Sequence, residues 1–372
     1  MIKLRENKES THTKPIKIAN LPQKVFIPLN QHFGATCESK VAVGEQVRTG
    51  QLIASLEKGL FSPIHSSVSG KVLAIQDCPH PTLGRSKAVI IENDNAEAKM
   101  DERIRNEQEI SNFSVEQLRK IIFDAGIVGL GGAAFPSHVK LSPPKKIDSF
   151  ILNGAECEPY LTNDFVLMKE KAKEIIQGAK IALKILGHPQ CYIAIEDNKP
   201  EAIKIMREAI KDTNFKLKVL KSSYPQGGEK QLTKSVLNRE VPSGGLPFDI
   251  GVVVHNVGTV FAIYEAVYKS KPLYEKVVTL TGSCLANPQN LLVRIGTTVR
   301  DLLEDCGSLV KEPAKIIFGG PMMGIAQYTL DVPVIKSTTG IIFFAKEELS
   351  SREDRVCCRC GRCVDVCPVK IM

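Results

Sequence analysis

The sequence predicts a multidomain α/β protein built around a doubly wound parallel sheet, and this prediction depends on how the pattern changes along the chain. With 372 residues, the chain is long enough for roughly two or three domains that each bury a core. Short β-type runs occupy residues 25–94, apolar strands alternate with helical segments over residues 114–271, and short strands return over residues 276–335. Alternation of strands and helices is typical of a parallel sheet with helices on both faces.

Composition narrows the class of protein. Apolar residues make up 43% of the chain and charged residues 24%, as in ordinary folded proteins. The formal net charge is +8, but Lys and Arg are dispersed in segments such as 168–186, so we expect no nucleic-acid partner. A basic face would instead suit anionic lipid headgroups or an acidic protein partner. The longest apolar stretch, residues 250–264, is broken by His255 and Asn256, so any membrane association should be peripheral, through partners.

Cysteine usage indicates the compartment. The chain has eleven cysteines, of which five lie between positions 357 and 367, while the other six are scattered and best interpreted as reduced thiols. Residues 1–17 are polar and contain no apolar region of the kind that a signal peptide needs. An odd count, a dense cluster and no visible leader predict a reducing cytoplasm rather than a disulfide framework.

The first 112 residues predict an arm, a small β domain and a linker. Residues 1–24 are polar, and we expect a loosely ordered arm. Residues 25–112 should form a barrel-sandwich followed by a charged linker from residue 95, because segments 44–51 and 62–72 resemble the two halves of a lipoyl- or biotinyl-type fold. Such carrier domains need a lysine at a hairpin tip. Lys58 lies near that place, but its neighbours Glu57 and Gly59 do not match, so a structural module is favoured over a covalent carrier.

Residues 113–272 predict the central α/β domain. Ser114 and Gln117 form the pattern of a capping box that opens a helix over residues 115–124. Four strands and four further helices alternate after it, with strands at 149–153, 191–195, 216–220 and 250–255, and helices at 163–186, 200–211, 229–237 and 260–269. Ligand sites in such sheets lie where the strands end. Residues 273–350 then predict a small α+β module with strands near 277–282, 291–296 and 316–320.

The cysteine run over residues 351–372 is the most specific motif. Cys357, Cys360, Cys363 and Cys367 follow the spacing C-x2-C-x2-C-x3-C-P of bacterial ferredoxins, which favours a [4Fe–4S] cluster over zinc. In two-cluster ferredoxins the fourth cysteine ligates the other cluster, so a second run should follow. Because the sequence stops at Met372, we expect a truncated ferredoxin-like segment that offers three ligands to one cluster and one to another. Cys358 falls inside the spacing and is not expected to be a ligand.

Glycine-rich loops are the second feature, after the cysteine run, that indicates a cofactor site. The segment 129–136 fits G-x-G-x-x-A, but it follows a helix and leaves little room for the long helix of a dinucleotide fold. Its exposed backbone amides suit a phosphate or a flavin, although a tight structural turn explains the pattern equally well. Segments 153–160, 224–231 and 255–259 also follow strands or precede helices. Four such loops in one α/β unit predict a ligand site at the edge of the sheet.

These motifs together resemble a known family. Segments 129–140, 153–164, 227–231 and 319–325, with the cysteine run, are similar to the RnfC (or RsxC) subunit of the Rnf electron-transport complex over nearly the whole chain. The core also resembles the flavin-binding subunit of respiratory complex I, with Ala134 where that subunit has a glycine. Residues 277–300 resemble the soluble-ligand-binding β-grasp domain found in both families.

The resemblance implies a set of cofactor-binding residues in the glycine-rich loop and the helix after it. Gly129, Gly131 and Gly132 would lie against FMN, and Lys140 would reach its phosphate or ring. Phe135 would stack on the nucleotide.

The other loops would complete the site. Asn153 and Glu156 would bond the flavin, while Asn256 and Thr259 would hold its phosphate. The complex I pattern has an aspartate where Ala155 stands, so one flavin contact is lost or replaced here.

The resemblance also implies the nucleotide site and the function. Gly227 and Gly228 would form part of the cofactor loop, and Glu158 and Glu229 would face the nicotinamide or ribose of NAD.

The expected protein is an oxidoreductase subunit of a membrane-bound, ion-translocating Rnf-type ferredoxin:NAD complex, at the cytoplasmic face of a bacterial or archaeal cell membrane. It would carry FMN and [4Fe–4S] clusters, two in the full family pattern, and no catalytic acid or base, since the flavin performs the hydride chemistry. A cobalamin reductase of similar architecture and a non-catalytic assembly scaffold remain alternatives.

Overall fold

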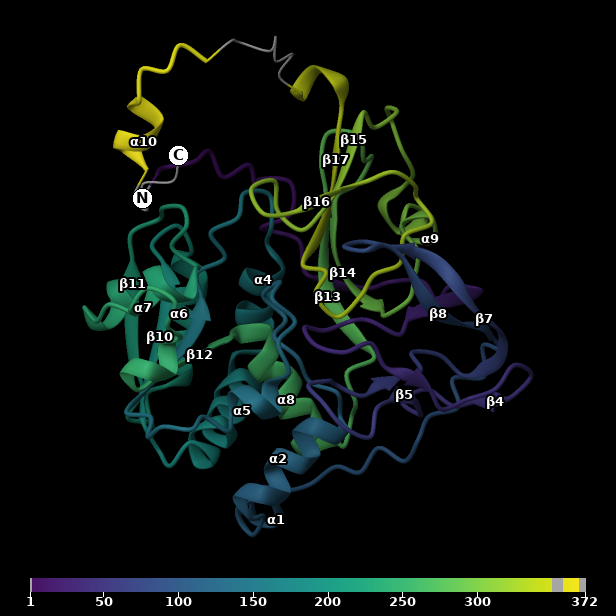
Figure 1. Cartoon of the computed structure of the whole chain (residues 1–372), viewed down its shortest axis with the longest axis horizontal. Coiled ribbons are helices and arrows are strands. Elements are labelled where there is room, and N and C mark those ends of the chain that lie inside the picture. The colour runs from purple at the N-terminus through teal and green to yellow at the C-terminus, as the bar shows by residue number, and fades with distance from the viewer. Residues whose placement is uncertain (1, 350–356, 368–372) are drawn as a thin grey trace.

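The middle of the chain forms a four-stranded parallel sheet in the computed structural model, which describes residues 2–349 and 357–367 (Figure 1). The strands lie in the order β11 (Lys216–Leu220), β10 (Gln190–Glu196), β9 (Ser149–Gly154) and β12 (Val252–Asn256). All neighbouring pairs are parallel. In chain order these are the third, second, first and fourth strands, so the direction of winding reverses between β9 and β12. Such a switch point opens a crevice at the carboxyl ends of its two strands.

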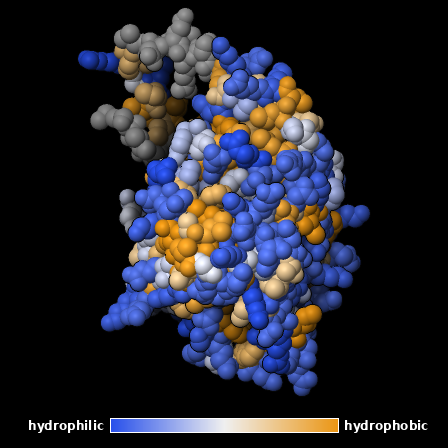
Figure 2. Space-filling model, turned by 90° about the vertical axis from the view of Figure 1, so that its right-hand side faces the viewer, coloured by the Kyte–Doolittle hydropathy of each residue, from blue (hydrophilic) through white to orange (hydrophobic). Residues whose placement is uncertain are grey.

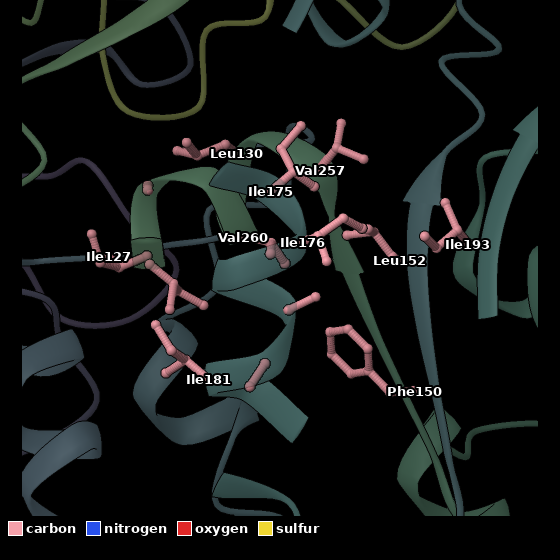
Figure 3. Packing of buried hydrophobic residues seen from close by; sticks show 14 of the residues in the cluster. Ile127, Leu130, Phe150, Leu152, Ile175, Ile176, Ile181, Ile193, Val257 and Val260 are labelled. Carbon is pink, nitrogen blue, oxygen red and sulfur yellow. The ribbon is translucent and has the colours of Figure 1, made fainter. Parts of the chain in front are cut away.

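Helices cover both faces of this sheet, as the sequence predicts. One face carries most of them: α2 (Val115–Asp124), α4 (Asn163–Glu170), α5 (Ala172–Ile185), α6 (Pro200–Ala209) and α8 (Val257–Lys269). The other face packs against α7 (Glu229–Leu237). Phe150 and Leu152 point into the larger helical layer (Figure 3), whereas Ile151 between them packs beside Leu232 of α7. This alternation follows from the two-residue period of a strand, and burying each such side chain stabilises the fold by about 1.5–3 kcal/mol.

Close packing between α5 and α8 depends on one glycine. A Cβ at Gly178 would lie 2.1 Å from the carbonyl oxygen of Val260, so no larger residue fits at this crossing. Ile176 and Val260 contribute to the same apolar layer (Figure 3). The position of α8, whose first turn borders the switch point, is therefore set by backbone contact with α5.

The N-terminal domain consists of two small sheets around a shared core. One sheet has the order β2 (Lys24–Pro28), β8 (Gly84–Asn93), β7 (Gly70–His80) and β4 (Gln46–Val47), and the other the order β3 (Glu38–Ser39), β5 (Leu52–Ser55) and β6 (Ile64–His65). Ile27, Ile53 and Ile91 fill the space between them. The predicted barrel-sandwich is thus confirmed.

A six-stranded mixed sheet forms the third domain. Its strands lie in the order β1 (Ile16–Ile18), β14 (Gln289–Arg294), β13 (Glu275–Thr281), β17 (Gly340–Phe344), β15 (Lys315–Phe318) and β16 (Ile325–Gln327). The short helix α9 (Val299–Leu302) packs its buried side chains into the same core. On the side of the molecule where this domain and the N-terminal domain lie, hydrophobic residues form separate groups among hydrophilic ones (Figure 2).

The expectation of a loosely ordered N-terminal arm was wrong. Strand β1 pairs in parallel with β14 at the edge of the six-stranded sheet. Thr11 is fully buried, and the Lys8 ammonium donates 2.7 Å to the carbonyl oxygen of Glu156. The segment remains largely exposed, but these contacts hold it against the central and six-stranded domains.

Two further expectations need correction. The helix expected over residues 163–186 is broken into α4 and α5 at Lys171, whose φ and ψ of −127° and 28° are not helical. The expected linker contains a short helix, α1 (Glu107–Ser111), and its Lys99 forms a β-bridge with Thr49. The remaining helices are short: α3 (Ser137–Lys140) and α10 (Arg362–Val366). No helix within residues 2–349 or 357–367 combines the length and apolar character needed to cross a membrane.

One buried lysine joins all three domains. The Lys336 ammonium donates to the carbonyl oxygens of Pro63 in the N-terminal domain (2.6 Å) and Gly126 after α2 (2.7 Å). Its side chain is almost fully buried, and burial lowers the pKa of Lys336 to about 7. Because a buried donor must be satisfied, this residue holds the three domains in one arrangement.

Candidate functional site

A cavity of about 420 Å³ opens at the switch point between β9 and β12. We call it the switch-point cavity. All three domains line it, through Gly131, Asn153, Glu156, Gly227 and Asn256 of the central domain, Thr82 of the β7–β8 hairpin, and Phe318, Met323 and Thr338 of the six-stranded domain. The four loops singled out in the sequence therefore converge, as expected for loops at the carboxyl edge of one sheet.

The glycine-rich loop closes on itself beside α8. The Gly129 N–H donates to the Phe135 carbonyl oxygen (2.9 Å), and the Ala134 N–H donates to that of Gly129 (3.0 Å). A Cβ at Gly131 would meet the Asn256 side chain at 3.3 Å. Gly132 has a φ of +109° and open space where a Cβ would stand. Glycine at these two positions lets bare backbone face the cavity, which suits close approach of a flat or phosphorylated ligand.

Asn256 and Thr259 anchor this loop to the start of α8. Asn256 is the N-cap, and its Oδ1 accepts from the Gly258 N–H at 2.8 Å. Thr259 is fully buried, and its hydroxyl accepts from the Leu130 N–H at 2.8 Å. Thr259 does not line the cavity, and its implied contact with a flavin phosphate stays a prediction. Thr259 positions the loop, while Asn256 both caps the helix and lines the cavity.

Asn153 and Glu156 organise the loop after β9. Asn153 donates to the carbonyl oxygen of Gly227 (3.0 Å) and thereby ties two of the loops together. Glu156 has a φ of +48°, and its Oε1 accepts from the backbone N–H of Asp164 at 2.7 Å. The Lys8 ammonium lies 3.5 Å from Oε2 of Glu156. Both side chains line the cavity, but their polar atoms are largely engaged in holding the loops.

Glu158 connects the central domain to the six-stranded domain. Its carboxylate accepts from the backbone N–H groups of Met322 (3.0 Å) and Met323 (2.9 Å) in the turn between β15 and β16. A Cβ at Gly320 would lie 2.1 Å from that carboxylate, so glycine is required there. Burial raises the pKa of Glu158, against the effect of the two amides. The Glu158 carboxylate thus holds the 319–324 turn, which lines the cavity.

Three implied ligand residues lie elsewhere. Phe135 packs beside Phe33 of the N-terminal domain, with ring centroids 5.9 Å apart, and does not line the cavity. Lys140 and Glu229 form an ion pair with each other, and neither lines the cavity. Their implied contacts with the nucleotide or flavin stay predictions. Gly228, the N-cap of α7 next to Glu229, does line it, together with Gly227.

The structure also adds residues that the sequence did not single out. Asp164 is buried at the start of α4 and lines the cavity. Burial first, and then the nearby Glu156 carboxylate, raise the pKa of Asp164 to about 7. Cys157 also lines the cavity, and its sulfur accepts from the Gly227 N–H at 3.2 Å. Both residues fall inside the 153–164 segment, but only the fold reveals which of its side chains are buried.

The C-terminal cysteines are not gathered in this structure. Cys357, Cys360 and Cys363 are exposed and Cys367 is half-buried. Among residues 2–349 and 357–367, no group of three or more His, Cys, Asp or Glu side chains is arranged around a common metal position. The four thiols retain the chemistry of an iron–sulfur ligand set.

Comparison with known families defines the class of protein. The central domain matches the family described as the Nuo51 FMN-binding domain over residues 122–265. Residues 2–96 match the RnfC barrel sandwich hybrid domain, and residues 277–326 match the SLBB domain. The central domain thus belongs to the class of FMN-binding domains that this family describes.

Similar proteins identify the family. The chain is 47% identical to the C subunit of the proton-translocating ferredoxin:NAD(+) oxidoreductase complex of Clostridium ljungdahlii, over 98% of the chain and 80% of that protein. It is 42% identical to the Na(+)-translocating counterpart of Acetobacterium woodii, over 98% of the chain and 83% of that protein. The C subunit of the ion-translocating oxidoreductase complex of Vibrio cholerae is 39% identical, over 99% of the chain and 48% of that protein. The chain belongs to the RnfC family of Rnf complex subunits, which confirms the resemblance.

Solved structures agree on the fold. A chain of an NAD+-reducing [NiFe]-hydrogenase in the H2-reduced state superposes with a TM-score of 0.55 at 18% identity, covering 63% of this chain and 47% of that one. The same hydrogenase type in the air-oxidized state gives a TM-score of 0.53. At such low identity the similarity concerns the fold alone.

Proposed function

We propose that the switch-point cavity binds FMN, and that the chain there exchanges electrons between NAD(H) and iron–sulfur clusters. As a member of the RnfC family, the chain is part of an ion-translocating ferredoxin:NAD+ oxidoreductase complex and contains an FMN-binding domain. The observation that supports the location is the convergence of four glycine-containing loops on a 420 Å³ cavity at the edge of the parallel sheet. A bound flavin accepts a hydride as an electron pair and releases electrons singly to one-electron carriers.

The residues of the chain supply shape, polarity and exclusion of water. The bare backbone at Gly131 and Gly132 would face the cofactor, and Asn153 and Asn256 would border it on the two strand ends. Phe318 and Leu161 form apolar parts of the wall, which would limit access of water to the reacting atoms. The 319–324 turn covers the mouth from the six-stranded domain. No side chain is required to act as a general acid or base for the hydride itself.

Titration with FMN tests this assignment. Wild-type protein should quench flavin fluorescence on binding, and anaerobic NADH should then bleach the yellow absorbance. The Gly131→Val variant places bulk against Asn256, where even a Cβ already makes a 3.3 Å contact, and should weaken FMN binding at least about tenfold. The Ala314→Val variant adds similar bulk at an exposed site in the six-stranded domain and should bind normally. Wild-type protein that leaves FMN unquenched would refute the proposal.

We also propose that Cys357, Cys360, Cys363 and Cys367 are iron–sulfur ligands. The ferredoxin spacing supports this, and the neighbouring Cys358 provides a matched control because it falls outside the spacing. Anaerobic reconstitution with iron and sulfide should give less bound iron in Cys360→Ser than in wild-type protein, while Cys358→Ser should retain it. Equal iron in both variants would contradict the assignment.

The position in the cell follows from the partners. We propose that the protein sits at the cytoplasmic face of the cell membrane and associates with it peripherally, through other subunits of the complex. We also propose the domain division 25–112, 113–272, 273–350 and 351–372, with residues 1–24 acting as a strap across the second and third domains. Limited proteolysis should cut between these domains before it cuts within them.

A further inference from the structure

A second, smaller cavity lies directly behind the wall of the switch-point cavity. It has a volume of about 30 Å³, and we call it the rear cavity. The two cavities share Asn163 and Asp164 at the start of α4. A space of this size holds a single water if polar groups surround it. Asn163 Oδ1 is one such group, since it is buried and accepts no hydrogen bond from the described residues.

Asp164 is the titratable group in this shared wall. Its carboxylate accepts from Asn256 Nδ2 at 2.6 Å and from Asn163 Nδ2 at 3.1 Å. The charged groups that face it are Glu156 from the loop after β9, Lys8 from the N-terminal segment and Lys276 from β13. With its pKa raised to about 7 by burial and by Glu156, Asp164 can hold or release a proton at neutral pH.

Lys276 is the second titratable group of the rear cavity. Its ammonium is almost fully buried and donates 2.8 Å to the carbonyl oxygen of Lys336. Among the described residues, no carboxylate oxygen lies within 4 Å of it, so it forms no direct ion pair. Burial lowers the pKa of Lys276 to about 7, while the charge of Asp164 opposes this shift. Burial thus favours the neutral form of both Asp164 and Lys276, and each group's charge opposes that shift in the other.

The rear cavity connects these two residues to partly exposed carboxylates. Glu265 of α8 and Glu275 of β13 line it, and their side chains are 14% and 13% exposed. Both accept from the Lys271 ammonium, at 2.8 Å and 2.7 Å. Ionisable groups thus line the rear cavity from Asp164, which it shares with the switch-point cavity, to the partly exposed Glu265 and Glu275.

We propose that Asp164 and Lys276 form a proton-exchange path that serves the redox site in the switch-point cavity. This inference rests on the proposed function, because it takes the cavity to hold the flavin. A hydride from reduced nicotinamide carries two electrons and one proton, and formation of neutral reduced flavin requires one further proton. Asp164 would give that proton and become a carboxylate, and Lys276 would restore the proton to Asp164 through the rear cavity. Glu265 and Glu275 take the replacement from solvent.

The same residues would also carry protons from the switch-point cavity to the surface. When the two electrons leave one at a time for iron–sulfur clusters, two protons leave the flavin. Both would leave in turn through Asp164 and Lys276 to the acidic pair at the surface, so that one proton taken up and two released give a net release of one proton per nicotinamide oxidised. Nicotinamide and the clusters are the only donor and acceptor of electrons that this scheme needs. Charge therefore stays balanced inside a cavity from which water is largely excluded.

Nuclear magnetic resonance of flavin-free protein tests the path without any turnover. In protein labelled with 13C at the aspartate carboxyl carbons, the signal absent from Asp164→Asn identifies Asp164. It should titrate with a midpoint near pH 7. Lys276→Met removes the positive charge that favours the carboxylate, and should move the midpoint upward. A signal that does not titrate between about pH 5 and 9, or a midpoint unchanged in Lys276→Met, would overturn the proposal.

Stopped-flow reduction of the FMN-loaded protein by NADH provides the functional readout. In wild-type protein, bleaching should slow as the pH rises through about 7 and should be slower in deuterated water. Asp164→Asn should bleach at least about tenfold more slowly, without the titration near pH 7, and Lys276→Met should shift the profile with the carboxyl midpoint. Asp212→Asn, at an exposed site, should match wild-type protein.

Different results would refute the proposed FMN site and the proposed proton path. If wild-type protein does not bind FMN, the proposed function fails, whatever the carboxyl titration shows. If FMN binds and Asp164→Asn bleaches at the wild-type rate with the wild-type pH profile, the proton path alone fails. Should Asp164→Asn not fold, the aspartate signal whose midpoint moves in Lys276→Met identifies Asp164 instead, and a matching shift of the rate profile in that variant decides the matter.

Discussion

The contact between Glu158 and the 319–324 turn provides the sharpest test of how the switch-point cavity is closed. Glu158→Ala removes both acceptors of the Met322 and Met323 N–H groups, at 3.0 Å and 2.9 Å. A hydrogen bond to a charged group contributes about 1.5–3 kcal/mol when buried. The two methionine side chains are 47% and 78% exposed, so water can replace much of the loss. We therefore expect the turn to lose about 1–2 kcal/mol of local stability, or roughly 5- to 30-fold in its opening equilibrium.

Hydrogen exchange measures this opening directly and needs no bound cofactor. The Met322 and Met323 amides should exchange roughly 5- to 30-fold faster in Glu158→Ala, with a smaller increase in Glu158→Gln, which keeps one acceptor oxygen. The exposed Glu312 belongs to the same domain, and Glu312→Ala should leave these amides unchanged. We also expect Glu158→Ala to weaken use of NADH while FMN stays bound. Unchanged exchange at both amides would refute the reasoning.

Three further predictions concern the residues that hold the site in place. Thr259→Val leaves the buried Leu130 N–H without its acceptor, so the free energy of unfolding should fall by about 1–3 kcal/mol in urea titrations, and FMN should bind more weakly. Gly154→Ala places a Cβ 2.6 Å from the sulfur of the buried Met168 and should lower the urea midpoint by an amount equivalent to about 1–3 kcal/mol. Burial lowers the pKa of Lys336 from 10.5 to about 7, so between these pH values the unfolded chain binds more protons and the free energy of unfolding rises with pH. Lys336→Met should reduce that slope, and an unchanged slope would show that the ammonium is not buried as described.

Much of the secondary structure was readable from local chemistry. The capping box predicted at Ser114 and Gln117 is present, and the helix begins at Val115 as expected. Pro200 opens α6 at the first helical position, where its missing N–H has no cost. Apolar runs such as 252–256 became strands of the parallel sheet. These features depend on neighbours within a few residues, so a single sequence contains them.

Errors arose where the deciding contacts were distant. Residues 1–24 have the composition of an exposed arm, yet β1 lies beside β14, which follows more than 270 residues later in the chain. The helix expected over residues 163–186 breaks at Lys171, although both parts, α4 and α5, pack into the same apolar core. No local pattern distinguishes these outcomes, because the free energy that selects them comes from burial against other domains.

The candidate site likewise contains residues that the sequence predicted and residues whose position depends on distant contacts. The glycine loops and the asparagines at the carboxyl ends of β9 and β12 were identified, because turn chemistry and strand ends are visible in sequence. Phe135 was expected on the nucleotide but lies against Phe33, and Glu229 was expected there but pairs with Lys140. Asp164 was not singled out at all. Which side chain of a loop faces the cavity depends on the partners that the fold brings to it.

By itself, the sequence determined the order of domains, the period of each strand and helix, the glycines that leave backbone bare, and the cysteine spacing. Each of these is a property of residue type over short distances, where sterics and local hydrogen bonds decide the outcome. Tertiary structure alone decided that three domains meet around one lysine, that Glu158 holds the 319–324 turn, and that Asp164 lies between two cavities. Those properties arise from removing charges and amides from water, and the free energy of that step depends on every group that surrounds them.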